Sequence, residues 1–577
     1  MKSDLRVSRR AFNGCDDRLP ADLHPVLRRI LLARGLGDPD RLDLALKRMA
    51  PPASLTGIDE AARLLAEAIR EDRRVLVVGD FDADGATGTA LAVRGLTALG
   101  ARHVEFRVPN RFEFGYGLTP GLVDTLAEAP PDLLMTVDSG IACLAGVERA
   151  RKLGIRVIVT DHHLPGEVLP AADAIVNPNL PGDAFPSKAL AGVGVVFYLL
   201  GAVRGALRTA GWFEGRRSEP NLAQYLDLVA LGTVADVVPL DYNNRILVRQ
   251  GLERIQAGVA SPGVLALLRV GKRDYRHVVA SDLGFAAGPR LNAAGRLEDM
   301  SVGIRCLLSD DPEEALEIAE ELDTLNRQRK TLQETMQTEA AEQVEGLLES
   351  LGEELPFSLC LHDDRWHQGI VGLVASRIKE AKHRPVIAFA PESAGASTLK
   401  GSARSIPGLH IRDVLAHVDA RYPGMIGAFG GHAMAAGLSL DRDRLEKFRQ
   451  ALEGSVRAFL DNDPPRREVR TDGELSPADM NLEFAMALAA LGPWGQRHPE
   501  PLFEGAFDVV DQRIVGGAHL KLMVRPRQGG EPVDAIAFGT LPEDLPDRSH
   551  LRLLYRLDVN HFRGQATVQL RVEHILS

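Results

Sequence analysis

Apolar positions between residues 73 and 239 form short runs that alternate with helical segments. The runs lie at residues 75–78, 103–108, 133–137, 156–160 and 174–176. Each run is too short for a helix, and all except the alternating run at 103–108 are mostly apolar, as expected of strands in a buried parallel sheet. This alternation predicts a parallel sheet with helices on both faces, and residues 222–270 continue as helices.

A longer helical pattern follows Asp311. Pro312 stands in the favoured first helical position, and apolar residues then recur at three-four spacing from Ala315 to Leu325. The helix could extend to about residue 351. We expect it to be a rigid connector between two globular regions, although a helix folded back onto one domain would give the same pattern.

The last two regions differ from each other in period. Residues 355–455 resume an α/β pattern, with strands at 357–362 and 385–389 and glycine clusters at 369–372 and 427–437. From about residue 465, residues 519–524 and 566–572 alternate strictly between apolar and polar positions. With the runs at 533–538 and 551–557, they predict a small β-barrel or sandwich, for which an oligonucleotide-binding (OB) barrel is plausible.

A chain of 577 residues is too long for one hydrophobic core. We expect a helical lead-in at 1–70, an α/β domain at 71–270, a linking segment with the long helix at 271–354, a second α/β domain at 355–460, and the barrel at 461–577. The net charge of −11 neither supports nor excludes a nucleic-acid substrate, so local basic patches must decide. No run approaches a membrane span, and the Arg9-Arg10 pair lacks the apolar segment of an export signal, so we expect a cytoplasmic protein.

Acidic residues and histidines follow several of the predicted strands. Asp80, Asp82 and Asp84 follow the first strand, and Asp138 follows the strand at 133–137. The triplet Asp161-His162-His163 follows the strand at 156–160, and Asp236 ends the apolar run 231–236. Ligands of parallel sheets bind beyond the carboxyl ends of the strands, so these side chains should meet there.

Unpaired carboxylates gathered at one site repel one another, and divalent cations remove this conflict. Oxygen ligands with an occasional imidazole suit Mg²⁺ or Mn²⁺. Zinc is disfavoured, because the cysteines are scattered at positions 15, 143, 306 and 360. Two ions that share a carboxylate are suited to in-line attack on a phosphate ester.

Each motif also has a purely structural interpretation. Asp-x-Asp is common in loops, Asp138 could cap a helix, His162 and His163 could be a structural pair, and Asp236 could cap a turn before Pro239. The set as a whole favours a metal site. We then expect His162 to be a metal ligand and His163 to touch a phosphate oxygen or position the leaving group.

A second constellation lies in the region 355–455. Gly401-Ser402-Ala403-Arg404-Ser405 and Gly430-Gly431-His432 combine glycines with an arginine and a histidine, which suits phosphate binding, although a tight turn is the alternative. Arg290 and Arg296, in the stretch 288–296, and Arg111 could also reach a substrate, or could be ordinary surface arginines.

These motifs resemble the DHH phosphoesterase superfamily and are most similar to its RecJ family of single-strand-specific nucleases. The resemblance rests on residues 79–87, 161–163, 231–240, 288–297, 366–372, 401–405 and 430–432. It implies a DHH domain and a smaller α/β DHHA1 domain joined by a long helix, followed by a C-terminal OB-type β-barrel. It also implies metal positions at Asp80, Asp82, Asp84, Asp138, His162 and Asp236.

The resemblance further implies catalytic roles for His163, Asp138 and Asp84. Arg111, Ser402 and Arg404 look like the family's pocket for a 5′-terminal phosphate, and exposed rings such as Tyr116 could stack on bases. The expected substrate contacts are Arg111, Tyr116, Arg290, Asn292, Arg296, Ser402, Arg404 and His432.

The expected function is a 5′→3′ exonuclease specific for single-stranded DNA. It would release 5′-mononucleotides with two Mn²⁺ or Mg²⁺ ions, in DNA repair and recombination. The alternatives are a phosphodiesterase for dinucleotides or short RNA, and a non-catalytic DNA-binding scaffold of the same fold. The family makes a single-stranded-DNA-binding protein and a helicase plausible partners. We expect a monomer, because no sustained apolar seam demands a second copy.

Overall fold

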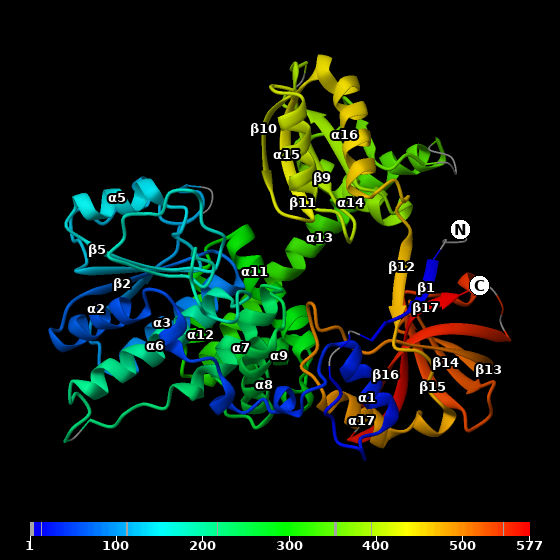
Figure 1. Ribbon diagram of the computed structural model, residues 1–577, viewed down its shortest axis with the longest axis horizontal. Helices are drawn as coiled ribbons and strands as arrows, with labels where there is room; N and C mark the ends of the chain where they lie inside the picture. The colour runs from blue at the N-terminus through cyan, green and yellow to red at the C-terminus, as the bar shows by residue number, and fades with distance from the viewer. Residues whose placement is uncertain are drawn as a thin grey trace. The chain divides into compact units, whose positions relative to one another are not determined.

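The computed structural model describes residues 5–12, 14, 16–110, 113–215, 217–350, 355–393, 395–545, 547, 549–562 and 564–576, with side chains of the long helix described up to residue 338. The chain divides into two compact units. Unit 1 comprises Met1–Ser8 and Gln328–Arg470, and unit 2 comprises Arg9–Arg327 and Thr471–Ser577. Figure 1 shows the elements of both.

Unit 2 contains the predicted parallel sheet. Its strands run in the order β3-β2-β4-β5-β6, and every neighbouring pair is parallel. The strands are β2 (Val75–Gly79), β3 (Val104–Arg107), β4 (Leu133–Val137), β5 (Arg156–Thr160) and β6 (Ala174–Val176). The predicted α/β fold is therefore confirmed for this region.

Helices cover both faces of this sheet. Val75 and Val77 of β2 pack into a core shared with α2 (Ile58–Arg70), α3 (Ala83–Leu99) and α6 (Gly192–Thr209). Leu76 and Val78 pack on the other side with α4 (Pro120–Asp124) and α5 (Leu144–Lys152). Because successive strand residues point to opposite faces, one apolar run supplies both cores. Helix α6 is long and apolar enough to cross a membrane, but most of its residues are buried in this core.

A helical layer follows the sheet. It consists of α7 (Leu226–Ala235), α8 (Tyr242–Gln256), α9 (Pro262–Val270), α10 (Ala280–Asp282), the π-helix η6 (Leu283–Ala287), α11 (Gly288–Leu297) and α12 (Ser301–Leu308). Helix α13 (Pro312–Ser350) begins at Pro312, as predicted, and its residues are divided between the two units.

The C-terminal part of unit 2 is a closed barrel in the order β13-β14-β15-β17-β16. Its strands are β13 (Phe503–Val515), β14 (His519–Pro526), β15 (Val533–Phe538), β16 (His550–Phe562) and β17 (Gln565–Leu576). The sequence predicted four of these strands and missed β13. Helices α1 (Pro25–Ala33) and α17 (Leu482–Ala490) pack into the barrel core.

Unit 1 is built on a mixed sheet in the order β10-β11-β9-β8-β7, in which only β7 and β8 are parallel. Its strands are β7 (Leu359–His362), β8 (Val386–Pro391), β9 (Thr398–Arg404), β10 (Ile426–Gly431) and β11 (Ala435–Asp441), and its helices are α14 (Gln368–Lys382), α15 (Ile411–Arg421) and α16 (Leu445–Phe459). A short β1 (Leu5–Arg9) pairs with β12 (Arg467–Thr471), so the lead-in that we expected to be helical begins with a strand.

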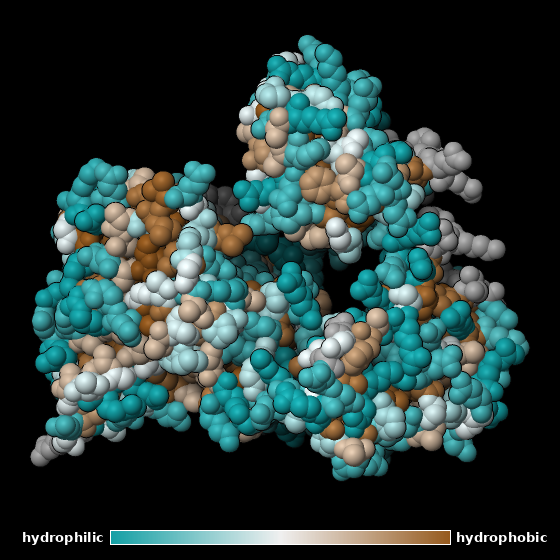
Figure 2. Space-filling model, viewed as in Figure 1, coloured by the Kyte–Doolittle hydropathy of each residue, from teal (hydrophilic) through white to brown (hydrophobic). Residues whose placement is uncertain are grey.

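The glycine cluster at 427–437 lies mostly in strands. It forms most of the antiparallel pair β10 and β11, with Gly430 opposite Gly437. Glycine within a strand leaves room for a ligand or another backbone to approach closely, so the predicted role in phosphate binding stays a prediction. On the visible face in Figure 2, apolar surface occurs as separate patches among hydrophilic residues.

Candidate metal centre and phosphate site

The register of the parallel sheet brings three aspartates to one edge. Gly79 pairs with Val137, and Val137 pairs with Thr160. The next residue after each strand is Asp80, Asp138 or Asp161. Strand order reverses between β2 and β4, and the crevice at such a switch point is where ligands of open α/β sheets bind.

Backbone amides hold the acidic residues that follow β2. Asp82 caps α3, and its Oδ1 accepts hydrogen bonds from the N–H groups of Asp84 and Gly85, both at 3.0 Å. Asp84 accepts hydrogen bonds from Gly192 and Val193, at 2.7 and 2.9 Å, at the N-terminus of α6. A helix N-terminus stabilises a carboxylate, so Asp84 is fixed although it is 1% exposed.

Asp138 is held in an unusual backbone conformation. Its φ is +60°, in the left-handed region that few non-glycine residues adopt. Gly192 packs closely against Asp138. A Cβ at position 192 would stand 2.7 Å from Asp138 Oδ1, which is closer than van der Waals contact. The chain therefore accepts local strain to place this carboxylate at the centre of the edge.

Asp138 and His162 lie at the spacing of two ligands on one ion. His162 Nε2 is 3.0 Å from Asp138 Oδ1, yet that oxygen is buried and has no hydrogen-bond partner. Nε2 also lies 3.5 Å from Asp236 Oδ2 and 3.9 Å from Asp84 Oδ2. Adjacent ligands of an octahedral ion with bonds of about 2.1 Å are separated by about 3 Å, and opposite ligands by about 4 Å.

The other expected ligands join the same cluster. Ligand atoms of Asp84, His162 and Asp236 lie within 4.8 Å of one another, as do those of Asp80, Asp82 and Asp138, and those of Asp138, His162 and His163. Asp138 and His162 each belong to two of these groups, and Asp138 is the natural shared ligand because a carboxylate offers two oxygens. Asp236 lies at the C-terminal end of helix α7. The apolar run before it had suggested the end of a strand instead.

The unpaired carboxylates resist ionisation. Burial and the neighbouring Asp82 raise the pKa of Asp80 to about 7, and burial and Asp84 raise that of Asp236 to about 8. Burial and Asp84 also raise the pKa of Asp138 well above its usual value. Burial lowers the pKa of His162 to about 4, which leaves its imidazole neutral and able to bind a cation.

Asp161 has a role that we did not predict. Its Oδ2 accepts the N–H of Ile141 at 2.9 Å, and its Oδ1 lies 2.8 Å from His163 Nδ1. This contact raises the pKa of His163 to about 9, and it lowers that of Asp161 although burial opposes ionisation. Asp161 orients His163, and the sequence signal for it was its place as the first member of the triplet.

Comparison with known proteins decides the family. Residues 74–233 match the model of the DHH family, N-terminal domain, residues 353–458 match the DHHA1 domain, and residues 471–574 match the RecJ OB domain. The chain is 54% identical to the single-stranded-DNA-specific exonuclease RecJ of Escherichia coli K12, over all of both chains. The chain belongs to the RecJ family.

Solved structures agree with this RecJ assignment. The crystal structure of RecJ from Thermus thermophilus in complex with Mn²⁺ matches with a TM-score of 0.76 and 32% identity, covering 99% of this chain and 79% of that one. The Mg²⁺ complex of the same protein matches with a TM-score of 0.70 and 30% identity, covering 99% and 78%. The predicted DHH, DHHA1 and OB-type fold is thus confirmed.

Near the metal cluster of this RecJ-family chain, the structure places some of the predicted substrate contacts. The hydroxyl of Tyr116 donates to the Asp138 carbonyl at 3.3 Å, and its ring lies edge-on to that of His163 at 6.3 Å. Asn292 Oδ1 accepts the N–H of Ala83, which starts α3. Arg296 is exposed near the end of the same helix, α11.

Arg290 has partners within the fold. Its guanidinium pairs with Asp323 at 2.7 Å and donates to the Ala286 carbonyl, so it ties α11 to the first turns of α13. Its partner lies 33 positions later in the chain, beyond any local pattern. Arg111 lies outside the described residues.

In unit 1, Arg404 and Ser402 are brought together. Arg404 donates through Nη1 to Ser402 Oγ at 2.8 Å and through Nε to Ser376 Oγ at 3.2 Å. Burial lowers the pKa of Arg404. A half-buried guanidinium beside two hydroxyls can bind a phosphate, and Ser376 of α14 had no sequence signal. His432 is exposed in the turn between β10 and β11.

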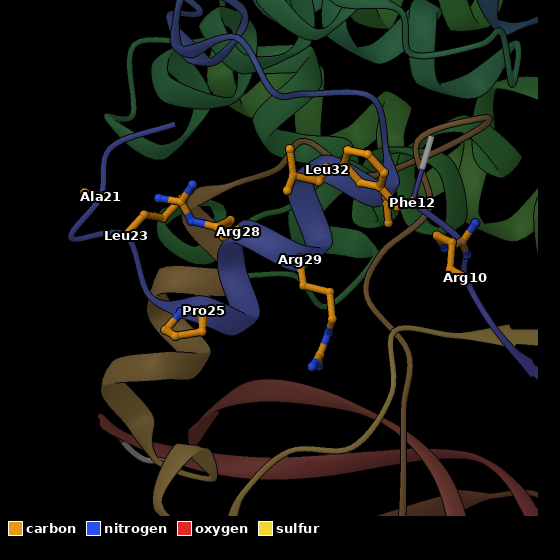
Figure 3. A pocket seen from close by; sticks show the side chains of 9 residues that line it. Arg10, Phe12, Ala21, Leu23, Pro25, Arg28, Arg29 and Leu32 are labelled. Carbon is orange, nitrogen blue, oxygen red and sulfur yellow. The ribbon is translucent and has the colours of Figure 1, made fainter. Parts of the chain in front are cut away.

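A separate hollow of about 380 Å³ lies on α1, and its lining includes Arg10, Phe12, Arg28 and Arg29. Figure 3 shows that Arg28 and Arg29 leave the helix in different directions. Arg28 already forms hydrogen bonds with Asp17. The hollow includes none of the predicted site residues, and its arginines do not converge on one point.

Proposed function

We propose that this protein is a metal-dependent exonuclease that degrades single-stranded DNA from its 5′ end and releases 5′-mononucleotides. The observation that supports it most is the cluster of carboxylates around His162, in which the buried Asp138 oxygen has a ligand-like neighbour but no hydrogen bond. The Escherichia coli relative carries the name of a single-stranded-DNA-specific exonuclease and is similar over its whole length.

Asp84, His162 and Asp236 would hold one ion, Asp80 and Asp82 a second, and Asp138 both. The predominance of oxygen ligands favours Mn²⁺ or Mg²⁺, the ions in the Thermus RecJ complexes. When bound there, such ions lower the pKa of a water and stabilise charge on the phosphate and the leaving oxygen.

The chain's own residues orient the substrate around these positions. His163 keeps its Nδ1 toward Asp161, which leaves Nε2 to donate a hydrogen bond to a phosphate oxygen. With its pKa raised to about 9, the imidazole retains its proton at neutral pH. The helix N-terminus that holds Asp84 keeps this carboxylate in place while substrate and product exchange.

Polarity requires a site that recognises the terminal phosphate. We assign this role to Arg404 with Ser402 and Ser376, whose donors form one polar group on unit 1. The same proposal includes contacts with a single-stranded-DNA-binding protein and a helicase. It also includes action as a monomer and a cytoplasmic role in DNA repair and recombination.

The test is digestion of 5′-phosphorylated single-stranded DNA with a 3′ label in the presence of Mn²⁺, with product lengths followed over time. We expect a ladder that shortens from the 5′ end, no digestion of duplex, and no products in EDTA. Intact DNA beside hydrolysed dinucleotides would favour a small-substrate phosphodiesterase. DNA that is bound but intact would favour a scaffold.

A further inference from the structure

One strongly exposed aromatic ring lies on a helical segment that packs against the C-terminal end of α7. Phe285 is 82% exposed, the largest exposure of any large apolar side chain among the described residues. It lies in the π-helix η6 (Leu283–Ala287), which leads directly into α11. Single π-turns inside helices are rare and occur frequently at functional sites.

The helical rod that bears Phe285 forms a wall of the metal cluster. A Cβ on Gly288 would lie 3.1 Å from the Cβ of Ala235, the last residue of α7 before Asp236. Further along the rod, Asn292 binds the N–H of Ala83 beside Asp82 and Asp84. The rod therefore contacts two of the three sequence segments that deliver the acidic ligands, those of Asp80–Asp84 and of Asp236.

Phe285 precedes Asn292 by seven residues along the rod, so it lies about two turns from the residue that contacts the start of α3. At about 1.5 Å per residue, they are about 10 Å apart along the axis. A separation of this size corresponds to a few nucleotides of a single strand, which places Phe285 within reach of a base close to a phosphate held at the acidic cluster.

A lysine follows the residue that packs against η6. Gly271 packs against Ala286 of η6, because a Cβ on Gly271 would lie 3.0 Å from the Cβ of Ala286. The next residue, Lys272, is exposed. Exposed aromatic rings that stack on bases, combined with cations that follow the backbone, are the two components of single-strand binding sites.

We propose that Phe285 stacks on a base of single-stranded DNA a few nucleotides from the scissile phosphate, and that Lys272 contacts the adjoining backbone. This inference rests on the proposed nuclease function and adds a specificity-determining surface to it. A ring that must lie flat on an exposed base selects against duplex, in which base faces are covered by their stacked neighbours.

The test compares the wild type with Phe285→Ala and Phe285→Tyr. The substrates are an intact single-stranded oligonucleotide and four others, each of which carries a single abasic site at one of the first four positions. Binding is measured by anisotropy in EDTA, and cleavage by KM and kcat in Mn²⁺. We expect Phe285→Ala to weaken binding and raise KM by about 5- to 150-fold, the range of one base–aromatic stack, with a much smaller change in kcat. Phe285→Tyr should restore both values.

The abasic substrates identify the stacked base. One abasic position should weaken wild-type binding by a similar factor and have little further effect on Phe285→Ala, because both changes remove the same contact. Lys272→Ala should reduce the slope of log K against log salt by about 0.7, the value for one phosphate contact on a single strand. Val259→Ala is the matched control, because Val259 is also an exposed apolar residue. It lies two positions from Ser261, whose N–H binds Asp227. Asp227 is in the first turn of α7, at the opposite end of that helix from Asp236.

Equal binding and KM for Phe285→Ala and wild type would overturn the inference, as would an equal loss for Val259→Ala. A wild-type protein that binds the oligonucleotide without cleaving it would contradict the nuclease function alone, and the binding series would still decide the role of Phe285. Because Phe285 is exposed, its truncation should leave the melting temperature nearly unchanged, which excludes misfolding as the cause of a loss.

Discussion

Unit 2 contains two dense groups of acidic side chains, and they differ in what surrounds them. On the barrel, Glu500 lies 2.9 Å from Arg556 and 2.7 Å from Arg571, and Arg556 and Arg571 also pair with Glu573 and Asp558. At the sheet edge, Asp80, Asp84, Asp138 and Asp236 meet one another around His162.

The difference separates a structural network from a binding site. Each carboxylate of the barrel network has a guanidinium partner within the fold, so nothing further is needed to neutralise it. The carboxylates of the sheet edge are more deeply buried, and burial together with mutual repulsion raises the pKa values of Asp138 and Asp236. Among the described residues, no arginine or lysine pairs with them. The absence of a partner, more than the density of charge, indicates where a divalent ion binds.

The largest expected effect is the loss of DNA cleavage when a carboxylate of the sheet edge loses its charge. Asp138→Asn keeps the volume of the side chain and tolerates the left-handed backbone, but it removes the charge that both ions would share. We expect the rate of DNA cleavage to fall by about 10³-fold or more, since metal ions contribute several kcal/mol to such transition states. Steady-state assays would measure the fall, with circular dichroism as the control for folding. Retention of most of the activity would contradict the two-ion assignment.

Stabilisation of the protein by Mn²⁺ should depend on the carboxylates of the sheet edge and not on those of the barrel network. Mn²⁺ at 100 times its dissociation constant should raise the free energy of unfolding of the wild type by about 2.7 kcal/mol. Thermal denaturation with and without EDTA would show this as a higher melting temperature. The increase should nearly vanish in Asp138→Asn and persist in Glu573→Gln. An equal increase in both variants would place the binding of Mn²⁺ elsewhere.

The contrast between partnered and unpartnered groups was only partly predictable from the sequence. Asp80, Asp138 and His162 could be located because short apolar runs define parallel strands, and the ends of such strands share one edge. Strand β13 was missed because its alternation is interrupted by a register shift between Val509 and Asp511. A local shift of this kind moves side chains to the opposite face and hides the period.

Other features depend on contacts between distant parts of the chain. The pairing of Arg290 with Asp323 gives a predicted substrate residue a partner within the chain, and no spacing rule reveals it. Phe285 stands in the apolar stretch 283–287, which suggests a buried position, yet the π-turn leaves it exposed. Asp161 could have been found by asking which neighbour would orient the second histidine of its triplet.

An effect of intermediate size is expected on the pH dependence of the free energy of unfolding, and it comes from a buried histidine that precedes the barrel. His498 is 5% exposed, and burial, with Arg245 and Arg34 nearby, lowers its pKa to about 3. Its unfolded pKa is about 6.5, so its contribution to stability is complete above pH 6.5 and is lost as the pH falls toward 3. Between pH 8 and pH 5, the free energy of unfolding should fall by about 2 kcal/mol from this group alone. Urea titrations across this range should show a flatter pH dependence for His498→Gln, and equal slopes would contradict the assignment.

The smallest expected effect is on the barrel network. Glu573 lies 2.7 Å from Arg556 and 3.6 Å from Arg571, and its side chain is about one-third exposed. Glu573→Gln removes one charge from a network in which both arginines also pair with Glu500. Solvent screens such pairs, so we expect the free energy of unfolding to fall by less than about 1 kcal/mol and cleavage to be unchanged. A large loss of cleavage without a loss of stability would mean that this charge acts on the substrate, because stability loss alone could not explain it. The barrel acids would then belong with the unpaired group at the sheet edge, and the presence of a guanidinium partner would no longer distinguish structural from functional carboxylates in this fold.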